Sequence, residues 1–425
     1  MNLNQELNRH PCFNAAVKGE CGRAHLPVAP KCNILCNYCN RKYDCVNESR
    51  PGVTSAVLTP HQAVAYLEEV VAREPRITVA GIAGPGDPFA NPRETMETLR
   101  RVREKFPELL LCLATNGLGL PPHIEELADL RVSHVSLTIN AVDPEVGRHI
   151  YSWVRDGKAV HRGLKAAELL LRRQLEAVAG LKAAGLTVKV NTIIIPGVND
   201  RQVRAVAQRM AALGVDLLNL MPVYPNADTP FAGLPEPSAG QMQALRGEAE
   251  KFLPQMRHCT RCRADAVGLL AEDRTGELRS CLTACAQLPP PLAPDRPYVA
   301  VATREGVLVN LHLGEAPSLQ IWGPDGRGGF TLVEERLAPP AGGGPERWWT
   351  LAKTLHDCRA VLVSALGETP REILKECGIM PVEMDGFIDL GLNTVYAGGA
   401  MNFLKARRGG LGRACSGRGG GGGCQ

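Results

Sequence analysis

The sequence predicts an α/β protein with a partial (β/α)6 barrel followed by a smaller α/β domain. Short apolar runs alternate with longer stretches in which apolar positions recur three and four residues apart, up to about residue 223. The stretch LPPPLAPDRP, at 288–297, interrupts this alternation, and the order of the elements changes after it. With 425 residues, of which 44% are hydrophobic, the chain is long enough to bury two cores.

The first domain, 1–287, is expected to contain six parallel strands. They are predicted at 25–30, 77–86, 109–117, 134–140, 188–197 and 215–223. Amphipathic stretches between them, such as 59–75 and 91–106, predict helices with N-terminal caps. Strands joined through helices form a parallel sheet with right-handed crossovers. Functional residues are then expected at the C-terminal ends of the strands.

The proline-rich stretch at 288–297 is expected to be a linker, and 298–404 a second α/β domain. Its predicted elements are a hairpin over 298–314 that turns at Glu305–Gly306, strands at 319–326 and 330–337, a helix at 347–357, a strand at 359–366 and a helix at 369–378. That last helix is expected to begin with a threonine cap and a proline. The glycine-rich stretch 405–425 is expected to be a mobile tail.

Composition narrows the functional classes. The net charge of +4 and the aromatic content of 4% give no case for nucleic-acid binding. The sequence has no apolar run of the roughly 20 residues that a membrane span needs. The N-terminal stretch lacks the apolar core of a signal peptide, so we expect a cytoplasmic protein. The 15 cysteines are therefore expected to be ligands or catalytic thiols rather than disulfides.

A cluster of cysteines, Cys32, Cys36, Cys39 and Cys45, follows the first predicted strand. Zinc sites are usually built from two CxxC or CxxH pairs that together supply four ligands. The spacing C-x3-C-x2-C of the first three instead suits three corners of a 4Fe–4S cluster and leaves the fourth iron open. An open iron can bind S-adenosylmethionine, and the cluster can then cleave this cofactor reductively. A structural zinc site remains the alternative.

Strand ends supply a second set of candidates. The stretch GIAGPGDP, at 81–88, follows the second predicted strand and contains Gly84, Pro85, Gly86 and Asp87. Its glycines would let backbone carbonyls approach the amino group of S-adenosylmethionine closely, although an ordinary turn has the same composition. Asn116 and Asn140 lie at the next two strand ends and could hydrogen-bond the cofactor or simply cap a turn.

Other potential ligands lie in the same domain. Cys259 and Cys262 form a CxxC pair flanked by basic residues, which indicates a metal site or a redox dithiol. Cys12 follows His10–Pro11 near the N-terminus, and His25 and Cys112 lie in predicted strands. A lone cysteine in an apolar strand is most often a buried hydrophobe. Cys281 and Cys285, four residues apart in a helical pattern, are expected to pack in the core.

Together these stretches resemble a known family. The cysteine spacing, with Tyr38 before Cys39, resembles the radical S-adenosylmethionine superfamily. The ordered stretches HPCF, AHLPVAP, CNILCNYCNRKYDCVNESRPG, AGIAGPGDP, LCLATNG, SLTINAVDPE and CTRCRADAVG resemble the NifB family within that superfamily, from residue 10 to about 275. RAVLVSALGETPREILKECGI and VEMDGFIDLGLNTVY resemble the NifX/NafY-type cofactor-binding module, which has an RNase H-like α/β fold.

The resemblance implies a radical S-adenosylmethionine enzyme of nitrogenase cofactor assembly. It would insert a carbide from S-adenosylmethionine and fuse two 4Fe–4S substrate clusters into the 8Fe–9S–C precursor of the iron–molybdenum cofactor. His25, Cys45 and Cys112 would bind one substrate cluster, with Glu48 as a labile fourth contact. Cys12, Cys259 and Cys262 would bind the other.

The implied partners are iron–sulfur cluster donor proteins, an electron donor such as ferredoxin or flavodoxin, and downstream carriers of the cofactor. Neither a nucleic acid nor a membrane is expected as a partner. A different radical enzyme with auxiliary clusters, such as a methylthiotransferase or an activase, is a second possibility. A non-catalytic iron–sulfur carrier is a third, although a carrier would not need the cofactor-cleaving cysteine motif. A purely structural zinc protein is the least favoured reading.

Overall fold

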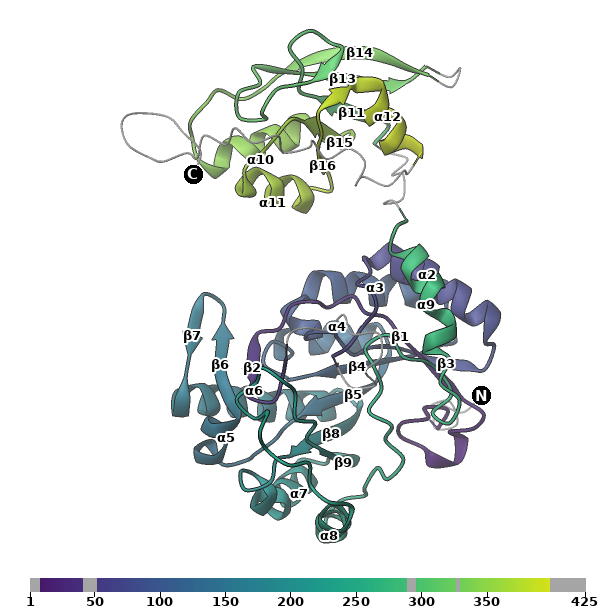
Figure 1. Ribbon diagram of the computed structural model, residues 1–425, viewed down its shortest axis with the longest axis vertical. Helices are drawn as coiled ribbons and strands as arrows, with labels where there is room; N and C mark the ends of the chain where they lie inside the picture. The colour runs from purple at the N-terminus through teal and green to yellow at the C-terminus, as the bar shows by residue number, and fades with distance from the viewer. Residues whose placement is uncertain (1–7, 41–51, 289–295, 326–328, 398–425) are drawn as a thin grey trace. The chain divides into compact units, whose positions relative to one another are not determined.

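The computed structural model describes residues 8–40, 52–288, 296–325 and 329–397 (Figure 1). The chain divides into two compact units, Met1–Ala286 and Gln287–Gln425, and each unit has its own hydrophobic cores. Most of the predicted linker and all of the predicted tail lie outside the described residues. Among the described helices, none combines the length and apolar character that crossing a membrane requires.

The first unit contains a seven-stranded sheet that curves into an open barrel. In spatial order its strands are β10 (Val267–Gly268), β1 (Gly22–His25), β3 (Ile77–Ile82), β4 (Leu110–Thr115), β5 (Val132–Thr138), β8 (Thr187–Ile194) and β9 (Leu217–Pro222). All neighbouring strands are parallel except β10, which is antiparallel to β1. The six parallel strands confirm the predicted partial barrel.

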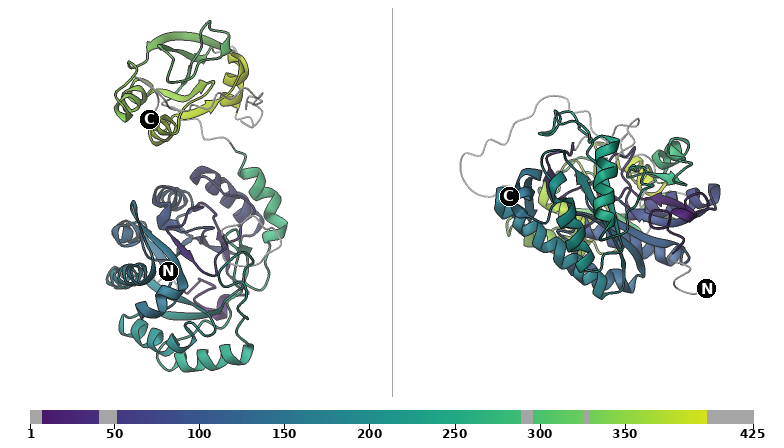
Figure 2. Two further views of the ribbon diagram at one scale, coloured as in Figure 1. Left: turned by 60° about the vertical axis from the view of Figure 1, so that its left-hand side comes forward. Right: turned by 90° about the horizontal axis from the view of Figure 1, so that it is seen from below.

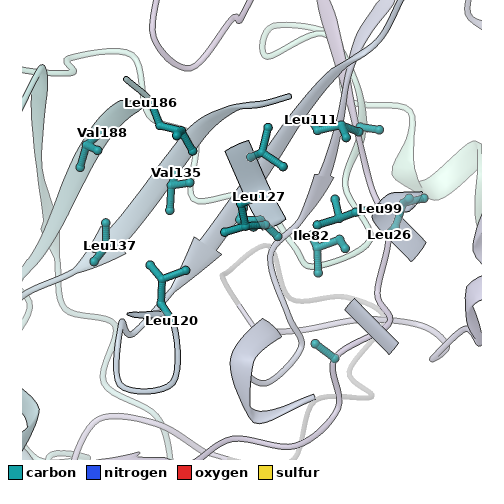
Figure 3. Packing of buried hydrophobic residues seen from close by; sticks show 14 of the residues in the cluster. Leu26, Ile82, Leu99, Leu111, Leu120, Leu127, Val135, Leu137, Leu186 and Val188 are labelled. Atoms are coloured by element: carbon teal, nitrogen blue, oxygen red, sulfur yellow. The ribbon is translucent and has the colours of Figure 1, made fainter. Parts of the chain in front are cut away.

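Helices lie around the outside of this sheet, as Figure 2 shows from two further directions. They are α2 (Pro60–Arg73), α3 (Pro92–Lys105), α4 (Ile124–Asp129), α5 (Pro144–Ile150), α6 (Gly163–Ala183), α7 (Val203–Ala212), α8 (Ala239–Glu250) and α9 (Thr275–Cys285). Helix α2 begins as predicted, because Thr59 and Gln62 form a capping box. Leu99 of α3 and Leu127 of α4 pack against strand residues such as Leu111 (Figure 3). The outward side chains of the strands therefore form the core and leave the inner face for chemistry.

The first strand was predicted too late in the sequence. It spans Gly22–His25 rather than 25–30, because Pro27 and Pro30 have no N–H group to donate to a neighbouring strand. The charged Arg23 interrupts the apolar pattern by which a buried strand is predicted. Its guanidinium is nevertheless buried, and it donates hydrogen bonds to the carbonyls of Gly268 and Leu269.

A small three-stranded sheet was not predicted. It consists of β2 (Ile34–Cys36), β6 (Tyr151–Asp156) and β7 (Ala159–His161), in that order. Strands β6 and β7 form a hairpin with Gly157 and Lys158 in its turn, and φ is +57° at the glycine. This hairpin pairs with β2 and thereby holds the segment that carries the first three cysteines.

The second unit has a five-stranded sheet with helices. Its strands run in the order β14 (Phe330–Leu337), β13 (Ser318–Pro324), β11 (Tyr298–Val301), β15 (Cys358–Val363) and β16 (Met380–Glu383), and its helices are α10 (Pro345–Thr354), α11 (Glu368–Glu376) and α12 (Ile388–Ala397). Two apolar clusters contain alternate residues of β11 and β15, which are the central strands. The second predicted α/β domain is confirmed.

Two local predictions in this unit were wrong. Residues 298–314 do not form a hairpin: β11 pairs with β13 and β15, whereas β12 (Leu308–Val309) pairs with β17 (Gly386–Phe387). Both strands pair with strands far away in the sequence instead of with each other across the turn at Gly306. Helix α11 begins at Glu368 with Gly367 as its N-cap, so Thr369 lies inside the helix instead of capping it.

Candidate functional site

A cavity of about 290 Å³ collects most of the predicted site residues. Its lining includes Cys12, His25, Cys32, Cys36, Tyr38, Cys39, Pro85, Gly86, Asp87, Asn116, Asn140, Cys259 and Cys262. Gly84 and Cys112 do not line the cavity itself, but Gly84 precedes Pro85 and Cys112 shares β4 with Ala114, and both of these neighbours line it. Cys45 and Glu48 lie outside the described residues. The cavity thus joins residues from both ends of the first unit.

Cys32, Cys36 and Cys39, which the sequence predicts as ligands of the radical cluster and which are here called the radical-cluster thiols, lie on one short segment that lines the cavity. Cys36 ends β2, and the amide of Cys39 donates to the carbonyl of Cys36 at 3.0 Å. The amide of Asn37 donates to the carbonyl of Ile150 at 2.8 Å, next to the hairpin strand β6. Backbone hydrogen bonds therefore fix the spacing of these thiols without using their side chains.

Polar side chains at neighbouring strand ends support this segment. The amide nitrogen of Asn140 donates to the hydroxyl of Tyr38 at 3.0 Å, and its oxygen accepts from the amide of Ile193 at 2.9 Å. The side-chain nitrogen of Asn116 lies 3.8 Å from the Cys32 sulfur. Burial, with a smaller effect of Cys36, raises the pKa of Tyr38 well above its usual value. The phenol therefore stays protonated beside the thiols.

The GPGD segment packs directly against the chain that leads into the cysteines. The amide of Gly86 donates to the carbonyl of Ala29 at 2.6 Å, and the amide of Asp87 donates to that of Lys31 at 2.8 Å. A Cβ atom at Gly86 would lie 2.0 Å from the carbonyl oxygen of Lys31, so only glycine fits there. Gly84 has φ +132° and its carbonyl accepts from the amide of Ala29. The two glycines allow this close approach.

Asp87 holds two strand ends together. Its buried carboxylate accepts hydrogen bonds from the amides of Phe89 and Asn116 at 2.9 and 2.6 Å, and from the hydroxyl of Thr115. Burial raises the pKa of Asp87, and these donors oppose the shift. Asp87 therefore positions Asn116 at the edge of the cavity.

His25 and Cys112 lie at the same level of the sheet, on either side of a glycine. His25 of β1 pairs with Gly81 of β3, which in turn pairs with Cys112 of β4. His25 Nδ1 lies 2.9 Å from the carbonyl oxygen of Arg263, so the Nδ1–H tautomer donates there and Nε2 keeps its lone pair. Burial lowers the pKa of His25 to about 4, so the ring is neutral. Its Nε2 is available as a ligand.

We predict that Gly81→Val reduces iron binding by the pair His25 and Cys112. A Cβ atom at Gly81 would lie 3.2 Å from Cδ2 of His25, so valine would displace the imidazole. Overpacking of this kind costs about 1–3 kcal/mol of unfolding free energy. Gly247→Val on α8, where a Cβ atom meets nothing within 4 Å, is the matched control. Iron per chain after anaerobic reconstitution should fall in the first variant only; equal iron in both would contradict the prediction.

Cys12, Cys259 and Cys262, here called the second thiol group, come together from opposite ends of the first unit. His258 Nε2 lies 2.9 Å from the carbonyl oxygen of Pro11, which ties the two segments to each other. Burial raises the pKa of Cys12 to about 11, and among the smaller influences are the charges of Cys262 and Cys259, which lie nearby. The sequence alone gave least support to Cys12, and the structure brings it to the CxxC pair.

Sequence reasoning missed Arg23 and noted Arg263 only as one of the basic residues that flank the CxxC pair. Arg23 donates to the sulfur of Cys262 at 3.2 Å and to the carboxylate of Asp273 at 2.9 Å. Arg263, between the CxxC pair and β10, pairs with the fully buried Asp265. The one available signal for Arg23 was its position within a strand-like run. An arginine buried in a strand needs an anionic or polar partner, so that position could have predicted one.

The thiols suit clusters better than single ions. Among the residues that the structure describes, no three His, Cys, Asp or Glu side chains converge closely enough to hold one metal ion. Ligands of a 4Fe–4S cluster bind different irons and need not converge in this way. Cys32, Cys36 and Cys39 line one cavity together with Gly86 and the polar strand-end residues Asn116 and Asn140. The residues present therefore fit a cluster with S-adenosylmethionine.

Comparison with known proteins shows the family of the chain. The Radical SAM superfamily profile matches residues 26–210. The FeMo cofactor biosynthesis protein NifB of Chlorobaculum tepidum is 54% identical over 405 residues, which cover 95% of each chain. The chain belongs to the NifB family. The NifB of Klebsiella pneumoniae is 41% identical, over 88% of this chain and 86% of the relative.

Membership of the NifB family accounts for both units. It implies a 4Fe–4S cluster and S-adenosylmethionine as cofactors of the first unit. Residues 296–398, in the second unit, match the profile named Dinitrogenase iron-molybdenum cofactor. Among solved structures, Streptococcus suis SuiB bound to S-adenosylmethionine aligns with 57% of this chain and 52% of its own, at 13% identity and a TM-score of 0.41.

Proposed function

We propose that the chain inserts a carbon atom from S-adenosylmethionine and fuses two 4Fe–4S substrate clusters into an 8Fe–9S–C precursor of the nitrogenase iron–molybdenum cofactor. One observation carries this proposal: the radical-cluster thiols and the second thiol group line the same cavity. Reductive cleavage of S-adenosylmethionine needs only the first of these groups. The second group offers iron–sulfur substrates a place beside the radical source.

Cys32, Cys36 and Cys39 are assigned to three irons of the resident cluster, whose fourth iron takes S-adenosylmethionine. When bound, this pair of cofactors supplies the one-electron chemistry that generates a 5′-deoxyadenosyl radical. The residues assigned to S-adenosylmethionine are Tyr38, Gly84, Pro85, Gly86, Asp87, Asn116 and Asn140. Most of them belong to the hydrogen-bonded network of strand ends described above. This network holds the cysteine segment and the cavity edge in one arrangement.

The two substrate clusters are assigned to separate ligand sets. His25 and Cys112 face each other across Gly81, and with Cys45 they would hold one cluster, with Glu48 as a labile fourth contact. The second thiol group would hold the other cluster. A cluster that must leave as product should be held by fewer ligands than a permanent one, and histidine or carboxylate ligands weaken the hold further.

The second unit is proposed to bind the product cluster. Its support is the match of residues 296–398 to a family named for the iron–molybdenum cofactor. The proposed partners are iron–sulfur cluster donors, an electron donor such as ferredoxin or flavodoxin, and downstream cofactor carriers. Covalent fusion of the two units would keep the product close to its next binding site.

Anaerobic reconstitution with iron and sulfide tests the proposal. We expect about three 4Fe–4S clusters, or about 12 iron atoms per chain. Electron paramagnetic resonance of the reduced protein should show that S-adenosylmethionine changes the signal of one cluster only. Finding a single cluster per chain, or zinc in place of iron, would contradict the proposed function.

A further inference from the structure

Lys189 places a buried positive charge on the inner face of the barrel. It lies in β8, only 6% of its surface is exposed, and it lines the cavity. Its ammonium group lies 3.8 Å from the sulfur of Met256 and 4.8 Å from the centroid of the Phe13 ring. Both neighbours are weak acceptors. Among the described residues, no carboxylate forms an ion pair with Lys189.

Other buried cations in this unit are paired. Arg23 is 1% exposed and pairs with Asp273, and Arg263 is 7% exposed and pairs with Asp265. A buried charge without a partner costs several kcal/mol, so proteins rarely keep one without a use for it. Since Lys189 faces a cavity rather than packed protein, the missing partner is expected to be an anion that enters the cavity.

The position of Lys189 relates it to both substrate sites. It pairs with Ser136 across the sheet, two residues beyond His134, which pairs with Cys112. Phe13, whose ring centroid lies 4.8 Å from the ammonium group, follows Cys12 in the chain, and Cys12 lines the same cavity as Lys189. Cys12 and Cys112 belong to different proposed ligand sets.

We propose that Lys189 binds the anionic 4Fe–4S substrate clusters from between their two ligand sets and offsets their mutual repulsion as they approach. This inference rests on the proposed function. A 4Fe–4S cluster with three anionic ligands, as Cys12, Cys259 and Cys262 or Cys45, Cys112 and Glu48 would supply, carries net negative charge, and two such anions repel strongly in a water-poor cavity. An ammonium group is a compact charge with three donors, and it can therefore hydrogen-bond the sulfides of either cluster.

Lys189→Met tests this inference, because methionine has a similar length and suits the neighbouring Phe13 and Met256. In the cluster-free chain, removal of an unpaired buried charge should leave the melting temperature unchanged or raise it. After anaerobic reconstitution, iron bound beyond the resident cluster should fall to about half or less. The remaining substrate clusters should have more negative reduction potentials, because a nearby positive charge favours the reduced, more anionic state.

Two further variants serve as controls. Lys189→Arg keeps the charge and should retain most of the iron, whereas Lys182→Met should behave as the wild type. Lys182 lies on α6 and already pairs with Asp216 at 2.6 Å. Cleavage of S-adenosylmethionine to 5′-deoxyadenosine should persist in all three variants, because the radical-cluster thiols are untouched.

The outcomes separate this inference from the proposed function. If the wild-type chain binds only the resident cluster, the proposed function and the role of Lys189 fail together. If the wild type binds three clusters and Lys189→Met binds them equally with unchanged potentials, only the role of Lys189 fails. A marked fall in the melting temperature of cluster-free Lys189→Met would show a structural role instead and would also overturn the inference.

Discussion

Cys36→Ala is expected to abolish reductive cleavage of S-adenosylmethionine, with 5′-deoxyadenosine formation reduced at least about 100-fold. Cys36 is one of three thiols that lie on a single segment at the cavity. A cluster that loses one of its three thiolates is held too weakly to stay in place. The segment itself should remain folded, because the bond from Cys39 to Cys36 and the pairing of β2 with β6 involve the backbone.

Two measurements check this expectation, namely 5′-deoxyadenosine by chromatography and iron per chain. Iron should fall by about four atoms per chain. Cys281→Ala is the matched control, since Cys281 is 8% exposed and packs in the core of the first unit. It should lose only a small part of the unfolding free energy and keep the cleavage activity. Undiminished cleavage by Cys36→Ala would mean that the radical cluster lies elsewhere.

Cys112→Ala is expected to keep cleavage of S-adenosylmethionine but to lose the carbon-containing product. Cys112 lies within β4, on the same side of that strand as Ala114, which lines the cavity, and it comes before Asn116, whose side-chain nitrogen lies 3.8 Å from the Cys32 sulfur. Loss of its sulfur would leave one substrate cluster without a ligand and would not disturb the radical source. Product formation is measured by transfer of the cluster to a cofactor-free nitrogenase, and radical formation by 5′-deoxyadenosine.

A control for this variant is Cys377→Ala, which changes a partly buried cysteine of the second unit. That variant should retain both cleavage and product. Cys112→Ser offers an oxygen ligand in place of sulfur and should restore part of the product. Full product formation by Cys112→Ala would remove Cys112 from the ligand set and return it to the role of a buried hydrophobe.

Several elements could be predicted from the sequence because their signals are local. Six parallel strands followed from apolar runs that alternate with amphipathic stretches, and five of them overlap the predicted ranges closely. The burial of Cys281 and Cys285 followed from their helical spacing in an apolar stretch. The hairpin β6–β7 was overlooked, although the Asp156–Gly157 pair is a recognised turn signal. Strand β7 is mostly exposed and β6 ends in charged residues, so the two short strands carried no clear alternation of apolar residues.

Local signals failed where distant partners decide the structure. Residues 298–314 contain a turn signal at Glu305–Gly306. Strand β11 nevertheless pairs with β13 and β15 and not with its neighbour in sequence. Arg23 appears too polar for a buried strand, but the carbonyls of Gly268 and Leu269 accept its hydrogen bonds. Both outcomes depend on residues far away along the chain, which no local pattern contains.

The sequence by itself determined the radical-cluster thiols, because three cysteines within eight residues stay together however the rest of the chain folds. It also determined the order of strands and helices, through hydrophobic periodicity. Only the tertiary structure decided that Cys12 meets Cys259 and Cys262, that Gly81 leaves room between His25 and Cys112, and that Lys189 is buried without a carboxylate among the described residues. The physical reason is that strand register and the curvature of the sheet set these distances, and both result from packing over the whole unit.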